Sequence, residues 1–226
     1  MGTDPTIFRT IDRMATPNST PFPHAAQTWN NRFAKDGYAF GTEPNEWLRR
    51  HASVWKAGSR ILCVADGEGR NSVWLAKQGH QVEAFDLSEV GVAKAKRLAQ
   101  ESQVNVNFAV AGCDDFAWRP DHYDGVAAIF VQFADPDLRA RLFENMARSL
   151  KPGGTLILVG YTPKQLDYGT GGPSVRSHLY TPEILQEAFA DLNIQVLDAY
   201  ETELAEGDGH KGRSAVMGLV ASRRPL

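Results

Sequence analysis

A chain of 226 residues suits one α/β domain better than two domains of roughly 100 to 150 residues each. With 42% hydrophobic and 23% charged residues, its composition excludes disordered and fibrous proteins. The net charge of -3, without any run of Lys or Arg, indicates neither nucleic acid nor an anionic membrane as the partner, so we expect a small-molecule substrate.

Signals for membrane insertion, secretion and metal binding are missing from the sequence. No apolar run reaches the roughly 18 residues of a membrane span, and the opening residues lack the basic start and apolar centre of a secretory signal. Cys63 and Cys113 are too few for a disulfide framework or a thiolate metal cage. These features predict a cytoplasmic protein without a metal site.

The N-terminal part of the chain divides into an arm and a cap. Residues 1–26 are rich in Pro, Thr and Ser, which predicts a flexible arm. A first helix is expected next, because one helical face that ends at Gly37 has the spacing of Trp29, Phe33 and Tyr38. A second helix is expected between Thr42, as its N-cap, and Gly58. We predict that residues 27–58 cap a single domain over 27–226.

From residue 61 onward, short apolar runs alternate with helical patterns. The runs lie at 61–65, 81–86, 104–110, 125–130 and 154–161, which predicts parallel strands with helices on both faces. Two further runs, 194–204 and 213–222, follow each other across a Gly-rich connection and read as an antiparallel hairpin. The predicted fold is a Rossmann-like α/β three-layer sandwich with a seven-stranded, mostly parallel sheet whose last strand is antiparallel.

A glycine turn follows the first predicted strand. Gly67 and Gly69 allow a tight backbone turn at the switch point of such a sheet, where a ligand can press against the main chain. Asp86 ends the second strand, where its carboxylate can accept hydrogen bonds from both hydroxyls of a ribose. The alternatives are an ordinary turn and a helix cap, although Ser88 competes for the capping role. We favour a nucleoside-type cofactor.

Two features of this turn favour S-adenosylmethionine (SAM) over a dinucleotide. Ser72 stands where a pyrophosphate-binding turn usually has Gly or Ala. The carboxylates of Asp66 and Glu68 would repel a pyrophosphate but suit a cationic sulfonium and ammonium.

Several ordered blocks resemble those of the class I SAM-dependent methyltransferases, and more narrowly the tellurite-resistance and thiopurine methyltransferases. The blocks are WNNRF, YAFGTEPNEWL, ILCVADGEGRNSVWLA, VEAFDLSEVGVAKA, LKPGGTLIL, YGTGGP, LYTPEIL and GHKGRSAVMGLVA. The resemblance implies methyl transfer from SAM.

The resemblance also implies roles for individual residues. The turn around the methionine part of SAM would comprise Ala65, Asp66, Gly67 and Gly69. Asp86 would bind the ribose and Leu87 would pack on the adenine, whose edge would be read by the Cys113 N–H and the Asp114 carboxylate. Phe130 and Gln132 would lie beneath the methyl group, with core packing as the alternative for Phe130. The chain departs from its relatives at Gly112, where an Asp is common, and at Gln132, where a His or another polar residue is common.

Other residues are candidates for the lid and the substrate pocket. Trp29, Arg32 and Tyr38 resemble an N-terminal lid, in which Arg32 would pair with the SAM carboxylate or remain a solvated charge. We expect the substrate-pocket candidates to lie in loops near the same sheet edge: Tyr168, Arg176, His210 and Arg213.

The acceptor is expected to be a small nucleophile. IFVQF lacks the Asn/Asp-Pro-Pro-aromatic motif typical of nitrogen methylation, which leaves a thiol or chalcogen oxyanion, a carboxylate or a phenol. A soft anionic acceptor needs no catalytic base, whereas His210 is the first candidate base for an oxygen or amine acceptor. Two alternatives remain: a SAM-fold binding or sensor protein without turnover, and an NAD-linked oxidoreductase.

Overall fold

Strands and helices alternate through most of residues 24–225, the part of the chain that the computed structural model describes. The strands are β1 (Arg60–Val64), β2 (Gln81–Asp86), β3 (Val106–Val110), β4 (Tyr123–Ile129), β5 (Leu150–Tyr161), β6 (Leu192–Glu206) and β7 (His210–Arg223). The α-helices are α1 (Ala25–Phe33), α2 (Glu46–His51), α3 (Arg70–Lys77), α4 (Glu89–Glu101), α5 (Pro136–Ser149), α6 (Gln165–Tyr168) and α7 (Pro182–Ala188). Two short 3-10 helices are η1 (Ala52–Val54) and η2 (Arg176–His178).

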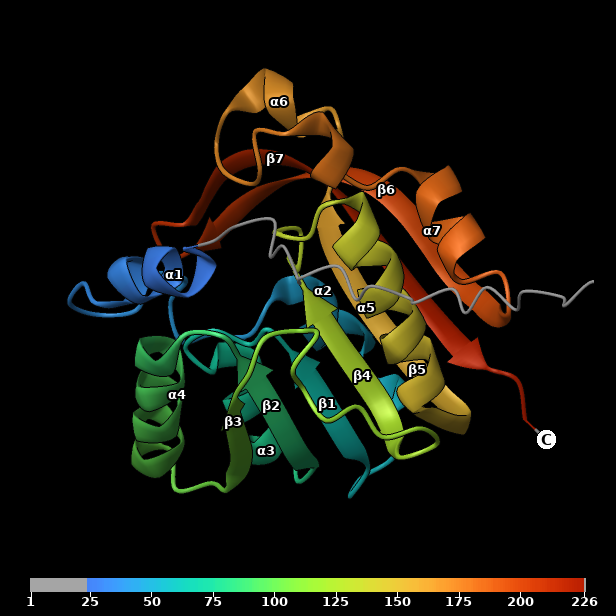
Figure 1. The fold of residues 1–226 in the computed structure, drawn as a ribbon, viewed down its shortest axis with the longest axis horizontal. Helices are drawn as coiled ribbons and strands as arrows, with labels where there is room; N and C mark the ends of the chain where they lie inside the picture. The colour runs from blue at the N-terminus through green and yellow to red at the C-terminus, as the bar shows by residue number, and fades with distance from the viewer. Residues whose placement is uncertain (1–23, 226) are drawn as a thin grey trace, which may run out of the picture.

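All seven strands form one sheet in the order β3-β2-β1-β4-β5-β7-β6 (Figure 1). Strands β1 to β5 pair in parallel, whereas β7 is antiparallel to both of its neighbours, β5 and β6. Six strands therefore run one way and the last runs the other way. The predicted sheet and its terminal hairpin are confirmed.

Each face of the sheet is covered by its own group of helices, as alternation along β1 shows. Ile61 and Cys63 belong to the core that contains Trp47 of α2, while Leu62 and Val64 belong to the core that also includes residues of α5 and α7. Figure 1 shows α5 in front of β4 and β5, with α3 behind the sheet. Burying each such side chain contributes about 1.5 to 3 kcal/mol, so both layers stabilise the sheet.

The cap differs from the prediction at three helix ends, one of which is the end of α2 at His51 rather than near Gly58. Helix α1 ends at Phe33, so Tyr38 lies beyond it. Asn45, not Thr42, caps α2, because its side chain accepts a hydrogen bond from the Leu48 N–H, while its own backbone N–H is held by Asn71. The arm predicted over residues 1–26 lies almost wholly outside the described residues. Within 24–225, no helix has both the length and the apolar character needed to cross a membrane.

Candidate active site

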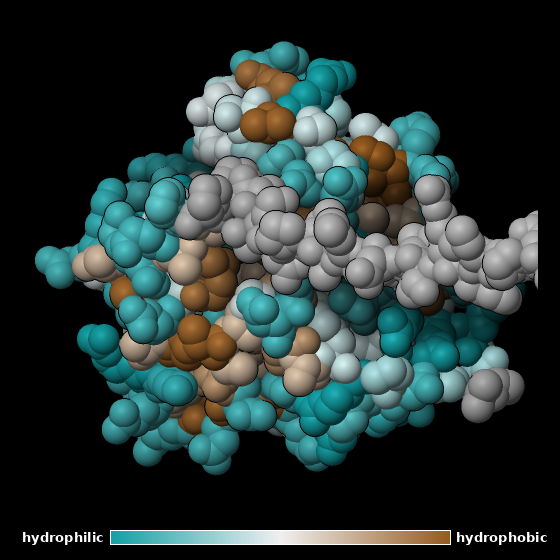
Figure 2. Space-filling model, in the orientation of Figure 1, coloured by the Kyte–Doolittle hydropathy of each residue, from teal (hydrophilic) through white to brown (hydrophobic). Residues whose placement is uncertain are grey.

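A cavity of about 290 Å³ opens where β1 and β4 end, at the point where the chain order of the sheet reverses. Ligands of open α/β sheets bind at such switch points. Figure 2 shows apolar residues gathered on this face of the molecule beside α1. The predicted site residues that line the cavity are Trp29, Arg32, Ala65, Asp66, Gly67, Asp86, Leu87, Phe130, Gln132 and His210.

Two non-glycine residues beside the cavity have left-handed backbones. Ala65 (φ 48°) directly follows β1, and Phe130 (φ 56°) directly follows β4. Such conformations cost about 1 to 3 kcal/mol and persist only where neighbouring structure holds them. Here the backbone N–H groups of Asp66 and Phe130 bond to Phe85 and Val159 in the adjacent strands. Both strand ends therefore bend sharply where the cavity begins.

Both the backbone conformation and the packing of the glycine turn require glycine at positions 67 and 69. Gly67 (φ 62°) lies against the Phe33 ring, and a Cβ there would come within 3.2 Å of it. Gly69 (φ 90°) lies against α4, where a Cβ would stand 2.7 Å from the Ala95 Cβ. Of the two, Gly67 lines the cavity, whereas Gly69 brings α3 close to α4.

Asp86 joins this turn to the end of β2. Its Oδ2 accepts a hydrogen bond from the Gly67 N–H at 2.9 Å, and its Oδ1 accepts one from the Ser88 N–H at 2.8 Å. Burial raises the pKa of Asp86 to about 6, against the lowering effect of these two bonds. Ser88, not Asp86, caps α4, because the Ser88 Oγ accepts from the Gly91 N–H. The free lone pairs of the Asp86 carboxylate remain for a ligand diol.

Asp66 is the second carboxylate of the cavity. Burial raises its pKa to about 7; the nearby Asp86 charge adds to this shift, and a hydrogen bond from the Ser72 hydroxyl opposes it. The same hydroxyl lies 3.2 Å from the Gly69 carbonyl oxygen. The Ser72 hydroxyl thus connects the glycine turn to the Asp66 carboxylate. A turn with this carboxylate suits a cationic ligand better than a pyrophosphate.

The opposite end of the cavity is aromatic and basic. His210 stacks with Phe40 and Phe130, at ring distances of 4.5 and 4.2 Å, and its Nδ1 lies 2.5 Å from the Tyr161 hydroxyl. Burial, followed by the charges of Arg70 and Arg32, lowers the pKa of His210 to about 3. His210 is therefore neutral near pH 7.

Sequence reasoning missed several residues at this end of the cavity. They are Phe40, Arg70, Asn71, Tyr161 and the loop 171–173. Arg70 Nη2 forms a buried ion pair with Glu206 at 2.7 Å. Only Arg70 could have been found from the sequence. It directly follows the glycine turn, so it begins the helix whose N-terminus faces the cavity.

Arg32 and Tyr38, both predicted lid residues, separate in the structure. The Arg32 guanidinium lies over the rings of Trp29 and Phe40, at 5.3 and 5.2 Å from their centroids, at the cavity. Tyr38 packs instead beside Lys94, whose Nζ is 5.7 Å from its ring. Lys94 also pairs with Glu68 at 3.0 Å, so Tyr38 belongs to the contact between the turn and α4.

The two predicted adenine-reading residues lie outside the cavity lining. Cys113 is buried in the core, and its carbonyl accepts a hydrogen bond from Trp118 Nε1 at 2.8 Å. Asp114 is exposed and forms a bidentate pair with Arg141, which lowers the pKa of Asp114. Their role toward adenine stays a prediction.

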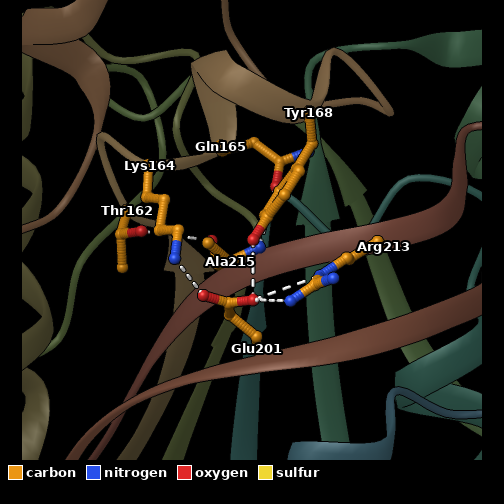
Figure 3. Close-up of polar contacts among 7 residues, drawn as sticks. All are labelled: Thr162, Lys164, Gln165, Tyr168, Glu201, Arg213 and Ala215. Atoms are coloured by element: carbon orange, nitrogen blue, oxygen red, sulfur yellow. Dashed lines mark hydrogen bonds and ion pairs between the residues drawn. The ribbon is translucent and has the colours of Figure 1, made fainter.

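Three substrate-pocket candidates lie outside this cavity, and two of them meet at Glu201 (Figure 3). Tyr168 donates to Glu201 at 2.6 Å, Arg213 pairs with it at 2.7 Å, and Lys164 completes the group, which we call the Glu201 cluster. Arg176 is exposed in η2. The expectation that Arg213 and His210 lie in loops is wrong, because β7 begins at His210 and pairs there with Glu206.

The Glu201 cluster ties the segment of residues 162–172, which contributes Gly171 and Gly172 to the cavity, to the hairpin β6–β7. We expect Glu201→Gln to raise hydrogen–deuterium exchange in 162–172 while leaving the melting temperature nearly unchanged, since exposed ion pairs contribute little to stability. Glu203→Gln, two residues along the same strand, is the matched control. Equal exchange in both variants would contradict this role.

In comparison with known proteins, residues 61–154 match the family model described as "Methyltransferase domain". An uncharacterized protein of Mycobacterium tuberculosis is 31% identical over 171 residues, which cover 74% of this chain and 59% of that protein. A ubiquinone biosynthesis O-methyltransferase of Xanthomonas campestris is 37% identical over 108 residues, which cover 47% of this chain and 45% of that enzyme. The chain thus matches about half of the length of these relatives.

Solved structures share the fold at low sequence identity. A structure from work on conversion of a disulfide bond into a thioacetal group during echinomycin biosynthesis has a TM-score of 0.72 at 15% identity, covering 89% of this chain and 92% of that one. TehB from Haemophilus influenzae has 0.65 at 16%, covering 88% and 67%. The N-methyltransferase NodS from Bradyrhizobium japonicum, in complex with S-adenosyl-L-homocysteine (SAH), has 0.65 at 14%, covering 88% and 97%.

These comparisons do not distinguish the tellurite-resistance or thiopurine subgroup, which stays a prediction. They support the predicted class over residues 61–154, which match the methyltransferase-domain model, and the fold of the chain resembles that of a methyltransferase solved with SAH.

Proposed function

We propose that this protein transfers a methyl group from SAM to a small-molecule acceptor, with a thiol or chalcogen oxyanion as the first class to test. The observation that carries the proposal is the Asp86 carboxylate, held by the Gly67 N–H at the edge of the switch-point cavity. A cavity of about 290 Å³ and the net charge of -3 favour a small acceptor over nucleic acid.

The chemistry of the cavity residues fits SAM. Asp86 would accept hydrogen bonds from the ribose hydroxyls, and Asp66 would face the cationic part of the molecule. Arg32 would pair with its carboxylate through a planar guanidinium. Hydrogen-bond acceptors for the ribose, a carboxylate for the cationic groups and a guanidinium for the carboxylate together match the functional groups of SAM.

Bound SAM supplies a sulfonium methyl group that an aligned nucleophile displaces in line. The residues of this chain would position the nucleophile for that displacement and exclude water from it. Phe40 and Phe130 provide apolar walls for that purpose, and the loop 171–173 covers the same end of the cavity. No protein group needs to bond covalently to the acceptor.

Isothermal titration with SAM and SAH tests the cofactor. We expect micromolar binding to the unchanged protein and a loss of about 1 to 3 kcal/mol in Asp86→Ala, because the charged hydrogen bonds to the ribose are removed. Asp137→Ala, an exposed residue in the first turn of α5, is the control. Absence of binding by the unchanged protein would refute the proposal, and nicotinamide cofactors would be tested next.

An oxygen acceptor is the second candidate, because a relative that is 37% identical over 108 residues is a ubiquinone biosynthesis O-methyltransferase. Release of SAH from SAM, measured with thiols, selenite, tellurite and phenols, separates the two classes. SAM binding without turnover of any acceptor would instead support a binding or sensor protein.

A further inference from the structure

The buried pair formed by Tyr161 and His210 determines where the imidazole proton lies. Burial raises the pKa of the Tyr161 hydroxyl well above its usual range and lowers that of His210 to about 3. The phenol therefore keeps its proton and the imidazole carries one proton, on either Nδ1 or Nε2.

The hydrogen-bond balance places that proton on Nε2. Within residues 24–225, His210 Nδ1 is the polar atom found within bonding distance of the Tyr161 hydroxyl. If Nδ1 carried the proton, the phenolic O–H would be left buried without an acceptor, which costs free energy. The Tyr161 O–H therefore donates to Nδ1, and Nε2–H is a donor.

The Nε2 edge is the part of the ring left to face the cavity. Phe40 and Phe130 are stacked 27° and 25° from parallel with the imidazole and cover its two faces, and Tyr161 covers the Nδ1 edge. Because His210 nevertheless lines the cavity, a ligand there meets the remaining edge.

The charged groups that act on His210 itself, Arg32 and Arg70, are also hydrogen-bond donors. Arg32 from α1 and Arg70 from α3 act on both His210 and Tyr161, and Glu206 from β6 acts on Tyr161. Glu206 already accepts hydrogen bonds from the Asn45 side chain and pairs with Arg70 Nη2. Arg70 Nη1 is buried and has no hydrogen-bond partner within the described residues.

We propose that the methyl acceptor binds as an anion, through hydrogen bonds from His210 Nε2–H and Arg70 Nη1, and that this end of the site supplies no general base. The inference rests on the proposed methyl transfer. A lone pair of the anion forms the new bond to the methyl carbon, the carbon–sulfur bond of SAM breaks, and its electron pair remains on sulfur as neutral SAH. No proton moves to the protein, so His210 acts as a hydrogen-bond donor rather than as a base.

The first test is the nitrogen-15 NMR spectrum of histidine-labelled protein, with the His210 signal assigned from a His210→Phe sample. We expect a neutral imidazole with its proton on Nε2 from pH 5 to 8, and loss of this tautomer preference in Tyr161→Phe. A proton on Nδ1, or titration of His210 between pH 6 and 7, would overturn the proposal. This readout needs neither SAM nor an acceptor, so it is independent of the proposed function.

The second test uses benzoate and its neutral isostere benzamide as probes of the SAH-loaded protein. With SAH bound, its own carboxylate is already accommodated, so benzoate reports on the acceptor end. We expect benzoate to bind about tenfold more tightly than benzamide and to shift the His210 Nε2–H signal. The double variant Arg70→Gln/Glu206→Gln, which leaves no unpaired buried charge, should abolish the preference.

Two results would contradict the anion site. Equal affinity for benzoate and benzamide would show that the site does not distinguish an anionic ligand from a neutral one. If benzoate bound to the free protein and SAH abolished this binding, His210 Nε2–H and Arg70 Nη1 would instead be donors to the carboxylate of SAM. Failure of SAH itself to bind would count against the proposed function, while the tautomer result would stand.

Discussion

The affinity for SAM is expected to fall steeply as the pH drops from 8 to 5. Both cavity carboxylates have raised pKa values, about 7 for Asp66 and about 6 for Asp86, and SAM favours their ionised forms. At low pH each must lose a proton before it can pair with the ligand, so binding releases protons and weakens on acidification. If both must ionise, the affinity at pH 5 is about 1000-fold lower than at pH 8; if Asp86 alone must, it is about tenfold lower.

Calorimetric titrations at half-unit pH steps, in buffers of different ionisation enthalpy, measure both the affinity and the protons released. Asp66→Asn should reduce the slope of log Kd against pH from nearly two to one. His210 does not contribute, because its pKa of about 3 lies below this range. A Kd that is constant from pH 8 to 5 would show that neither carboxylate contacts the ligand.

Replacing Gly69 by Ala should destabilise the protein by about 2 to 4 kcal/mol. One part is the left-handed backbone, with a φ of 90°, and the other is the overlap of the new methyl group with Ala95 of α4. Because α3 and α4 pack directly on each other, neither can move away without losing its contacts with the sheet. Thermal and denaturant unfolding measure the loss.

Gly79→Ala separates these two causes. Gly79 has nearly the same backbone, with a φ of 86°, but a Cβ there would meet no atom within 4 Å. Its replacement should cost only the conformational part, about 1 to 2 kcal/mol. If the two variants were equally stable, the close approach of α3 to α4 would not be what requires glycine at position 69.

The strands of the sheet could be predicted from the sequence because their apolar runs are local signals. The end of β2 at Asp86 agrees with the prediction, since the same local pattern defines it. The helix ends of the cap were harder. Asn45 was missed because partners distant in the sequence, Asn71 and Glu206, hold it in place.

The same distinction applies to the candidate site. Asp66, Gly67 and Asp86 follow strand ends, and strand ends can be located from the sequence. Arg70 and Tyr161 come together with His210 only because β7 packs antiparallel beside β5, a pairing that no local pattern encodes. The left-handed backbone of Phe130 has no sequence signal either, because any residue type other than glycine is disfavoured there.

The reversed direction of β7 places the start of that strand, rather than its end, at the cavity. Gly209 of the hairpin turn 207–209 therefore lines the cavity, and its N–H donates a hydrogen bond to the Ala39 carbonyl oxygen. A hairpin turn tolerates a change of length better than a buried strand does, although this turn packs against Ala39 and Phe40. Lengthening or shortening this turn offers a route to new acceptor preferences, by evolution or by design, that leaves Asp86 and the glycine turn untouched.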